Sequence, residues 1–355
     1  MLFIKDINLA KLQKNFRSCF DLLLLSGKVI NIMTNIDKSR IWFSVVNVYA
    51  ASKTASRHWE KAEIVLKSLG IMYHGNRTGR SGNAMEITFD ACMAGYRRFV
   101  AVGGDGTVHD VLNGIAAYVD WSGSVAFEDF TLAVIPLGSG NDWIKSTGIP
   151  KDVSKAVALL ADPVPGKQDV VRVCVIDDNQ NPLSVSYMVN VGGVGIDARV
   201  CERVNAQKSR GMRGKILYVT SLLHAIRHRR PASAKVVCDG RTVFEGSYLS
   251  MAFGVGKYSG GGMRQTPEAV LDDGLLDVTV IPDMPLKRIA CEVFRLFTGT
   301  FLKVPELVAA KARKITVIPC DRACAEPAEV DGEVVGKVPV SFEVLDSQIN
   351  IVLGR

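Results

Sequence analysis

The stretch Val102-Gly103-Gly104-Asp105-Gly106-Thr107 lies between an apolar run and an amphipathic segment. Residues 99–102 are typical of a short buried strand, and apolar residues then recur at helical spacing. The glycines let the backbone approach a ligand, and the amide groups at a helix N-terminus favour an anion such as phosphate. Asp105 would face a cation that accompanies the phosphate, and Thr107 is placed to cap the helix. An ordinary strand-to-helix turn is the alternative that these residues leave open.

A second turn of the same kind follows further along the chain. Residues 131–135 form another apolar run, which opens into Pro136-Leu137-Gly138-Ser139-Gly140-Asn141-Asp142. Ligands of open parallel sheets bind beyond the carboxyl ends of the strands, so we expect the two turns to be neighbours. The carboxylates of Asp105 and Asp142, beside phosphate-binding amides, suggest Mg²⁺ as the cation. Capping of the next helix is the alternative role for Asn141 and Asp142.

The N-terminal half alternates strands and helices. The pattern predicts strands at residues 42–46, 71–73, 99–102 and 131–135 and a helix at 84–93. Such alternation is typical of an α/β fold with a doubly wound, mostly parallel sheet. From about residue 166, short β-rich runs separated by turn residues predict an antiparallel second domain.

Composition narrows the class of protein without choosing a substrate. The chain has 355 residues, of which 48% are hydrophobic and 22% charged, and its net charge is +7. These values fit a globular protein with an anionic partner, either a nucleotide or a lipid surface. The eight cysteines form no Cys-x-x-Cys pair, which argues against a disulfide framework, and only Cys320 and Cys324 lie close together. No apolar stretch is long enough to span a membrane.

Several motifs in one order carry a family resemblance. They are residues 103–107 with Asn113-Gly114, 136–142, Asn190 with Gly195-Ile196-Asp197-Ala198, Gly260-Gly261-Gly262-Met263 with Pro267, 272–277, and Val330-Asp331-Gly332-Glu333. The sequence resembles the diacylglycerol kinase catalytic-domain family, which includes sphingosine and ceramide kinases and bacterial soluble lipid kinases. The resemblance covers roughly residues 41–355. NAD kinases and phosphofructokinases share only the first motif.

The resemblance implies a domain organisation. The first domain would be the nucleotide-binding α/β domain, formed by residues 41–165 and by a return of the chain at about 337–355. Residues 166–336 would form a β-sandwich that binds the lipid substrate. Residues 1–40 match nothing in the family, so we expect a non-native or disordered extension, with a short amphipathic membrane anchor as the alternative.

The resemblance also implies roles for residues at the two turns. ATP phosphates would bind the turn at 103–107, and Asp105 and Asp142 would belong to the magnesium and water network. The residues implied in nucleotide binding are Asn47, Thr78, Gly103, Gly104, Gly106, Thr107, Gly138, Gly140 and Asn141.

Two further sites follow from the same resemblance. Asp273 and the carbonyl groups of Val270 and Leu275 would hold a structural magnesium ion, whereas the local sequence alone favours an Asp-Gly hairpin turn. Glu333 would be the general base that takes the proton of the lipid hydroxyl, and it would act with Asp105 as a catalytic residue. Without the resemblance, Glu333 is an ordinary turn residue.

The chain also departs from the family pattern. Members usually have Asn-Pro-x-x-Gly after the first strand, but here residues 47–53 contain neither proline nor glycine, and Ser52 or Lys53 would have to compensate. Asn83 replaces a usual histidine. His109-Asp110 stands where Asn-Glu is common.

We therefore expect a lipid kinase that uses ATP and Mg²⁺ as cofactors and phosphorylates a lipid hydroxyl, of the diacylglycerol or sphingoid-base type, in phospholipid metabolism. Its partners would be ATP and a lipid at a membrane surface, without nucleic acid, and a homodimer is possible. The protein would be cytoplasmic and peripherally membrane-associated, through the basic cluster around Arg227 or the basic and apolar residues at 287–303. Solvated polar faces are the alternative for both segments. An NAD kinase-like phosphotransferase and a catalytically impaired lipid- or nucleotide-binding module are the alternative functions.

Overall fold

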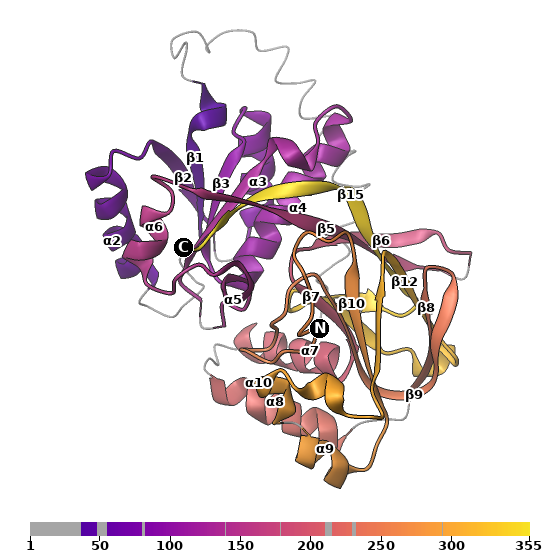
Figure 1. Ribbon diagram of the computed structural model, residues 1–355. Coiled ribbons are helices and arrows are strands. Elements are labelled where there is room, and N and C mark those ends of the chain that lie inside the picture. The colour runs from indigo at the N-terminus through magenta and orange to yellow at the C-terminus, as the bar shows by residue number, and fades with distance from the viewer. Residues whose placement is uncertain are drawn as a thin grey trace.

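The computed structural model has two units, which are joined by long strands (Figure 1). The structure describes residues 37–47, 55–79, 82–138, 140–177, 179–209, 215–228, 232–292 and 294–355. Most of residues 1–40, the residues 48–54 that include Ser52 and Lys53, and Ser139 lie outside these ranges.

A parallel sheet forms the centre of the first unit. Its strands, in spatial order, are β4 (Thr131–Pro136), β3 (Arg98–Gly103), β1 (Trp42–Val46) and β2 (Tyr73–Arg77). Nearly every residue of β1, β3 and β4 is buried, because helices cover both faces of the sheet. The prediction of a doubly wound α/β fold is confirmed.

Helices cover this sheet on opposite faces (Figure 1). They are α2 (Ala55–Ser68), α3 (Ala84–Met93), α4 (Asp105–Ser122) and α6 (Val153–Ala158). Right-handed crossovers explain why the helices are divided between the two faces of the sheet. The chain moves in one direction across the sheet from β1 to β2 and in the opposite direction from β2 to β3 and β4. Accordingly, α3 packs against α4, and α2 packs against α6.

Two local expectations need correction. The second strand begins at Tyr73 rather than at residue 71, because its pairing with β1 starts where Trp42 meets Tyr73. Thr107 does not cap α4: the capping residue is Gly104, and Thr107 lies inside the first turn of the helix. The strand at 42–46 and the helix at 84–93 have the predicted bounds.

The second unit is built from antiparallel strands, as expected. They are β5 (Val164–Ile176), β6 (Pro182–Met188), β7 (Val191–Gly195), β8 (Ala232–Cys238), β9 (Arg241–Gly254), β10 (Leu276–Pro282), β11 (Val308–Ala312), β12 (Lys314–Pro319), β13 (Pro327–Val330), β14 (Glu333–Lys337) and β15 (Val340–Leu353). Strand β8 alternates between buried and half-buried residues, as a strand with one face on a core does. A separate apolar core that includes Phe253 and Phe342 fills this unit.

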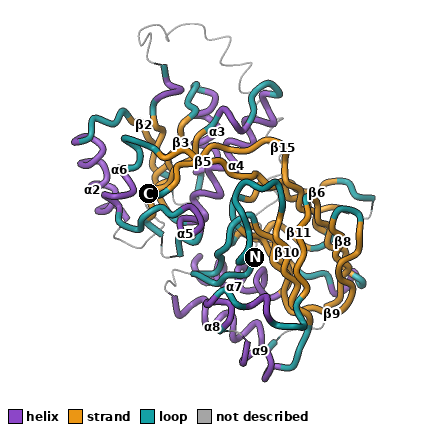
Figure 2. Tube along the Cα trace, in the orientation of Figure 1, coloured by secondary structure: helices purple, strands orange, loops and turns teal. Residues whose placement is uncertain are grey.

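The other helices of the described ranges belong partly to the first unit and partly to the second. They are α5 (Trp143–Thr147), α7 (Ile196–Ser209), α8 (Lys215–Arg227), α9 (Leu286–Glu292) and α10 (Arg295–Thr298), with 3₁₀ turns η1 (Lys38–Arg40), η3 (Phe127–Asp129), η4 (Phe301–Lys303) and η5 (Arg322–Cys324). Figure 2 shows α7, α8 and α9 together at the end of the second unit that lies away from the parallel sheet.

The strands of the two units form one continuous sheet. Strand β15 pairs with β12 through its first residues and with β5 along most of its length, and Asn350 and Ile351 pair with β4. The chain thus returns to the first unit, but only the end of β15 reaches the parallel strands. The predicted boundary at residue 166 lies within β5, so it does not interrupt the sheet.

Helix α4 connects the two units through a polar face. The Asn113 Nδ2 atom donates to the Tyr187 carbonyl oxygen at 2.9 Å, and the Tyr187 amide donates to Asn113 Oδ1 at 2.9 Å. About two turns further along α4, Asp120 Oδ2 accepts a hydrogen bond from the Tyr187 hydroxyl at 2.8 Å. These bonds fix the position of α4 relative to β6.

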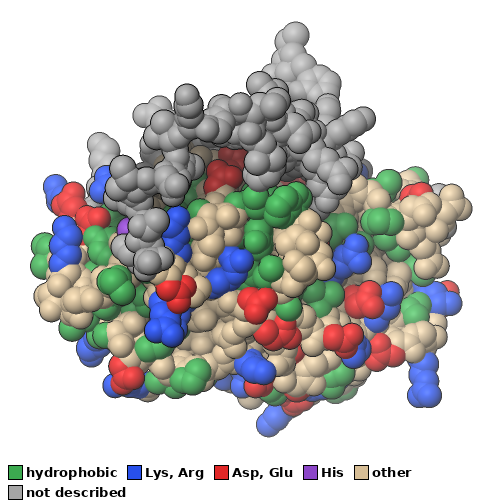
Figure 3. All heavy atoms as spheres, turned by 90° about the horizontal axis from the view of Figure 1, so that it is seen from above, with side chains coloured by type: hydrophobic (Ala, Val, Ile, Leu, Met, Phe, Trp, Pro, Cys, Tyr) green, Lys and Arg blue, Asp and Glu red, His purple; other side chains and the backbone are tan. Residues whose placement is uncertain are grey.

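Two features are relevant to membrane contact, the distribution of surface charge and the length of the apolar helices. On the face seen in Figure 3, basic and acidic side chains alternate, so the net positive charge is not gathered there. Among the helices in the described ranges, none is long and apolar enough to cross a membrane.

Candidate active site

The two glycine-rich turns lie side by side at the carboxyl ends of β3 and β4. The Leu137 amide donates to the Gly103 carbonyl oxygen at 2.7 Å. At the end of β1, the Asn47 Nδ2 atom donates to Thr107 Oγ1 at 3.2 Å. The structure therefore brings together the ends of β1, β3 and β4, and the prediction that the two glycine-rich turns are neighbours is confirmed.

Glycine is required here for the packing of the two turns. A Cβ atom on Gly138 would lie 2.5 Å from the Gly104 Cα atom, and one on Gly103 would lie 2.2 Å from Thr107 Oγ1. Gly104 caps α4 without any side-chain hydrogen bond. The N-terminal amides of α4 are therefore not covered by a capping side chain, which suits them to bind an anion.

Asp105 holds the second turn in place. Its carboxylate accepts hydrogen bonds from the Asp142 amide and from the Trp143 amide, both at 3.0 Å. Burial raises the pKa of Asp105, the two amide bonds lower it, and the negative charges of Asp142 and Asp331 raise it again, so that the pKa is above its ordinary value. A bound cation would offset this cost of a buried negative charge.

Asp142 connects the site to the second unit. Its Oδ1 atom forms an ion pair with Lys145 at 2.5 Å, and its Oδ2 atom accepts from the Gly261 amide at 2.6 Å. Although Asp142 stands at the start of α5, its side chain makes no capping bond. The helix-capping alternative for this side chain is therefore wrong.

Asn141 and Thr78 complete the predicted nucleotide site. Asn141 adopts a φ of 51°, and its Nδ2 atom donates to the Gly138 carbonyl oxygen at 2.7 Å. The buried Thr78 hydroxyl has no hydrogen-bond partner within the described ranges. An unpaired buried hydroxyl at a strand end is consistent with a ligand contact. Gly140 lies against Asp105, where a Cβ atom would be 3.2 Å from Oδ2.

The Asp331–Glu333 turn joins β13 to β14 and faces α4. The buried Asp331 carboxylate accepts from His109 Nδ1 at 3.0 Å and from the amides of Val189 at 3.0 Å and Asn190 at 2.9 Å. The Gly332 amide donates to Glu329 Oε2 at 2.8 Å. Both oxygens of the Asp331 carboxylate and the Gly332 amide are therefore paired.

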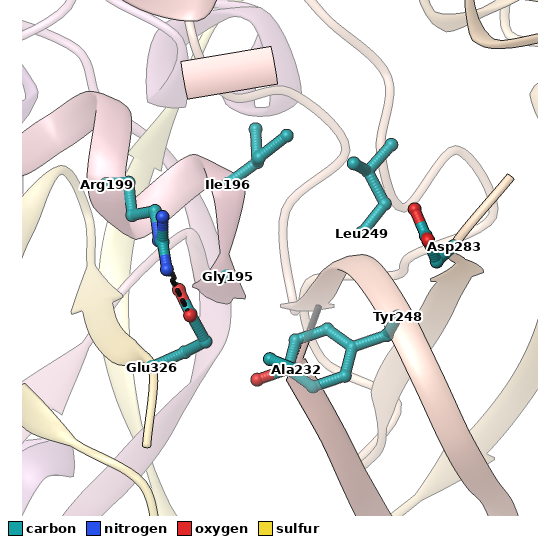
Figure 4. Close-up of a pocket in the computed structure, with 8 residues that line it drawn as sticks. All are labelled: Gly195, Ile196, Arg199, Ala232, Tyr248, Leu249, Asp283 and Glu326. Carbon is teal, nitrogen blue, oxygen red and sulfur yellow. Dashed lines mark hydrogen bonds and ion pairs between the residues drawn. The ribbon is translucent and has the colours of Figure 1, made fainter. Parts of the chain in front are cut away.

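Glu333 is exposed and points at the start of α4. A Cβ atom on Gly106 would lie 3.7 Å from Glu333 Oε1, while Glu333 Oε2 accepts from Asn205 Nδ2 at 3.2 Å. Asn205 is carried by α7, and α7 is fixed by the ion pair of Arg199 with Glu326 (Figure 4). The carboxylate thus stands beside the helix end that was predicted to bind phosphate.

Buried carboxylates surround the turn. Burial raises the pKa of Glu329 well above its ordinary value, although the Gly332 amide opposes this, and the charges of Asp197 and Asp331 raise it further. On α4, burial raises the pKa of Asp110 to about 6, with His109 opposing and Glu333 adding to the shift. Burial of these acidic groups thus favours their protonated, neutral form.

Asp105 and Asp142 fit a magnesium ion that travels with a nucleotide. Within the described part of the chain, no three metal-binding side chains converge on one point. Mg²⁺ commonly binds through one or two carboxylates, with phosphate oxygens and water as its other ligands. Asp105 and Asp142 would supply these one or two carboxylates.

The second predicted metal site contains a lysine. Asp273 Oδ1 accepts from the Leu275 amide at 3.1 Å, and Asp273 Oδ2 lies 3.2 Å from Lys311 Nζ. Lys311 also lies 3.0 Å from Asp277 Oδ2. A metal ion held by Asp273, Val270 and Leu275 stays a prediction, and Lys311 would compete with it.

Sequence reasoning did not identify several residues of the site. His109 could have been found, because it lies three residues after Gly106 and thus on the same face of α4. Lys145 has a similar relation to Asp142. No sequence motif marked Asn205 or Glu329 as a site residue, because only the fold brings them to the Asp331–Glu333 turn.

Two family models match the chain. That of the diacylglycerol kinase catalytic domain matches residues 42–173, and that of the YegS C-terminal NAD kinase beta sandwich-like domain matches residues 190–353. The two matches correspond to the two units of the fold.

Named relatives agree with these matches. A Xanthomonas campestris pv. campestris protein named "Probable lipid kinase YegS-like" is 28% identical over 272 residues, which cover 77% of this chain and 83% of that protein. A Staphylococcus carnosus protein named "Diacylglycerol kinase" is 22% identical over 307 residues, 86% of this chain and 93% of that protein. The crystal structure of a diacylglycerol kinase from Bacillus anthracis is similar in fold, with a TM-score of 0.64 at 19% identity over 89% of this chain and 97% of that chain.

Proposed function

Because the chain belongs to the diacylglycerol kinase catalytic-domain family and is a phosphotransferase of the kinase type, we propose that it transfers the γ-phosphoryl group of ATP to a lipid hydroxyl. One observation carries the proposal. The exposed carboxylate of Glu333 lies beside Gly106, in the first turn of the helix that would bind the phosphates. A base and a phosphate-binding helix end are the two parts that such a transfer needs.

The nucleotide would bind across the ends of β1, β3 and β4. The amides at the start of α4 would contact the phosphates, and the unpaired Thr78 hydroxyl would contact another part of the nucleotide. Mg²⁺, held by Asp105 and Asp142, would neutralise negative charge on the phosphate oxygens. Lys145 is paired with Asp142, so the ion would compete with it for this carboxylate.

Glu333 would accept the proton of the attacking hydroxyl. Its Oε2 atom is held by Asn205, so Oε1, which faces Gly106, is the oxygen available to the acceptor. As the hydroxyl oxygen bonds to the γ-phosphorus, the bond between the γ-phosphorus and the leaving ADP oxygen would break, and the hydroxyl proton would pass to Glu333. Phosphoryl transfer depends mostly on position and charge, which suits a site with one exposed base.

We further propose that α10 contacts the membrane. Phe294 and Phe297 are 70% and 52% exposed, and the exposed Lys287 and Lys303 lie close to them in sequence. Exposed aromatic residues with nearby lysines suit a bilayer interface that contains anionic lipid.

The buried side of α10 contacts the chain segment that also binds Asp142 of the candidate active site. Leu296 packs with Met263, Phe301 and Val304, and its carbonyl oxygen accepts from the Arg264 amide at 2.7 Å. Met263 and Arg264 follow the glycines at 260–262, and the Gly261 amide donates to the Asp142 carboxylate. A membrane that contacts α10 would thus lie close to the acceptor site.

The activity is tested with radiolabelled ATP and a set of acceptors. Purified protein and Mg²⁺ are incubated with a lipid extract, diacylglycerol, a sphingoid base or NAD. We expect label in a lipid product. Label in NAD alone would support an NAD kinase instead, and nucleotide or lipid binding without transfer would support a non-catalytic module.

The membrane contact has its own experiment. A Phe294→Ser, Phe297→Ser variant should sediment less with vesicles that contain an anionic phospholipid, and should keep its activity on a dispersed short-chain acceptor. Unchanged sedimentation would contradict the role of α10.

A further inference from the structure

Helix α4 contacts the second unit through residues that recur at helical spacing. Gly106 faces Glu333, His109 binds Asp331, and Asn113 binds the backbone of Tyr187. Residues 106, 109 and 113 lie on one face of a helix. One face of α4 therefore carries both the start of the phosphate-binding helix and the contacts that set its distance from the Asp331–Glu333 turn.

His109 is the α4 side chain that binds this turn. Its Nδ1 atom lies 3.0 Å from Asp331 Oδ2, and both side chains are almost fully buried. Burial alone would lower the pKa of His109, but the hydrogen bond and charge of Asp331, with the charges of Asp110 and Glu333, outweigh it, and the pKa is raised. The acceptor of this hydrogen bond is a carboxylate, and a hydrogen bond to a carboxylate is stronger than one between neutral groups.

The rest of the turn cannot replace this bond. The other partners of Asp331 are the amides of Val189 and Asn190, and the partner of Gly332 is Glu329. All of these belong to the second unit. They fix the shape of the turn but not its distance from α4.

We propose that His109 is a positioning residue, which sets Glu333 against the N-terminus of α4 by holding Asp331. This inference rests on the proposed function, because it assigns His109 a role in the transfer to a lipid hydroxyl. His109 does not touch the reacting atoms. It acts through the two-residue link from Asp331 to Glu333, so its removal displaces the base and leaves the nucleotide turns intact.

The chain offers a graded set of variants. His109→Ala removes the bond, whereas His109→Asn keeps a donor, because asparagine Nδ2 is attached to Cγ as histidine Nδ1 is. Tyr187→Phe is the matched control, since it removes the bond to Asp120 on the same helix and across the same boundary, away from the turn. Melting curves show which variants fold.

The expected result is a loss in kcat without a change in the KM for ATP. His109→Ala should lower kcat for lipid phosphorylation about 10- to 100-fold, since displacement of a catalytic group by an ångström has effects of this size. His109→Asn should recover most of the loss, and Tyr187→Phe should stay within about threefold of wild type. If His109→Ala does not fold, His109→Gln, whose longer side chain misplaces the donor, takes its place.

A double-mutant cycle separates positioning from general structural damage. Once Glu333→Gln has removed the base, adding His109→Ala should lower kcat by less than about twofold, because the two residues act as one unit. An additive loss, a raised KM for ATP, or an equal loss in Tyr187→Phe would overturn the inference alone. A wild-type protein that phosphorylates no lipid would overturn the proposed function, and this inference with it.

Discussion

The Asp331–Glu333 turn and the Asp272–Leu275 turn have similar local structures. Each has an aspartate followed by a glycine with positive φ, 90° at Gly332 and 75° at Gly274. Each glycine amide donates to a buried carboxylate, Glu329 at 2.8 Å or Asp169 at 2.7 Å.

The two turns differ in what their aspartates contact. Asp331 is buried and binds His109 and two amides, whereas Asp273 is partly exposed and binds Lys311. One aspartate therefore joins two units of the fold, and the other pairs with a lysine of its own unit. The two turns thus have similar backbone structures, but their aspartates make different contacts because different elements of the fold pack against them.

The largest expected difference between the turns is in catalysis. Glu333→Gln keeps the size of the side chain but cannot accept a proton, so kcat should fall about 10²- to 10⁴-fold with little change in the KM for ATP. Asp272→Asn, in the other turn, should keep kcat within about twofold of wild type. Steady-state kinetics with the lipid acceptor measure both. If Glu333→Gln retained near-normal kcat, another group would take the proton.

The second difference is in stability. Asp331→Asn leaves a buried histidine without its carboxylate, which should lower the free energy of unfolding by on the order of 3 kcal/mol. Asp273→Asn removes a partly exposed ion pair, which is worth about 0–1 kcal/mol. Denaturant unfolding of both variants compares them. Equal losses would mean that the burial of Asp331 does not matter.

The third difference concerns metal binding at the Asp273 turn. If Mg²⁺ binds there, Lys311 competes with it, so Lys311→Met should increase the rise in melting temperature on addition of Mg²⁺. Asp273→Asn should abolish the rise. Melting curves with and without Mg²⁺, in the absence of nucleotide, measure the effect. The same response in all three proteins would exclude Asp273 as a ligand.

The smallest difference is in pH dependence. The pKa of Glu329 is raised well above its ordinary value mainly by burial, so the folded state binds a proton that the unfolded state releases. Folding stability should therefore fall as the pH rises from the ordinary glutamate pKa through the raised one. Glu329→Gln should gain melting temperature relative to wild type between pH 5 and pH 8.

Asp169→Asn is the matched variant in the other turn. Burial also raises the pKa of Asp169, although less strongly, because its bonds from Gln348 and Gly274 oppose the shift. We expect the same direction and a smaller gain. A gain for Glu329→Gln that is largest at pH 5 would reverse the assigned sign.

Local patterns were sufficient to predict most of the first unit. Strand β1 and helix α3 have their predicted bounds, because buried parallel strands are continuous apolar runs and the helices between them are amphipathic. The edge strand β2 was placed too early. Most of its residues are exposed, so its bounds depend on pairing with β1 rather than on burial.

The sequence by itself determined the family, the fold class and the glycine-rich turns, because glycine spacing, apolar runs and motif order are properties of neighbouring residues. Only the tertiary structure decided which acidic groups meet. Asp331 reaches His109 across 222 positions of the chain, and Asp142 reaches Gly261 across 119. Lys311 lies beside Asp273 because β10 pairs with β11. Such contacts depend on how the strands pair and how α4 packs on the second unit, so the local pattern of residues does not predict them.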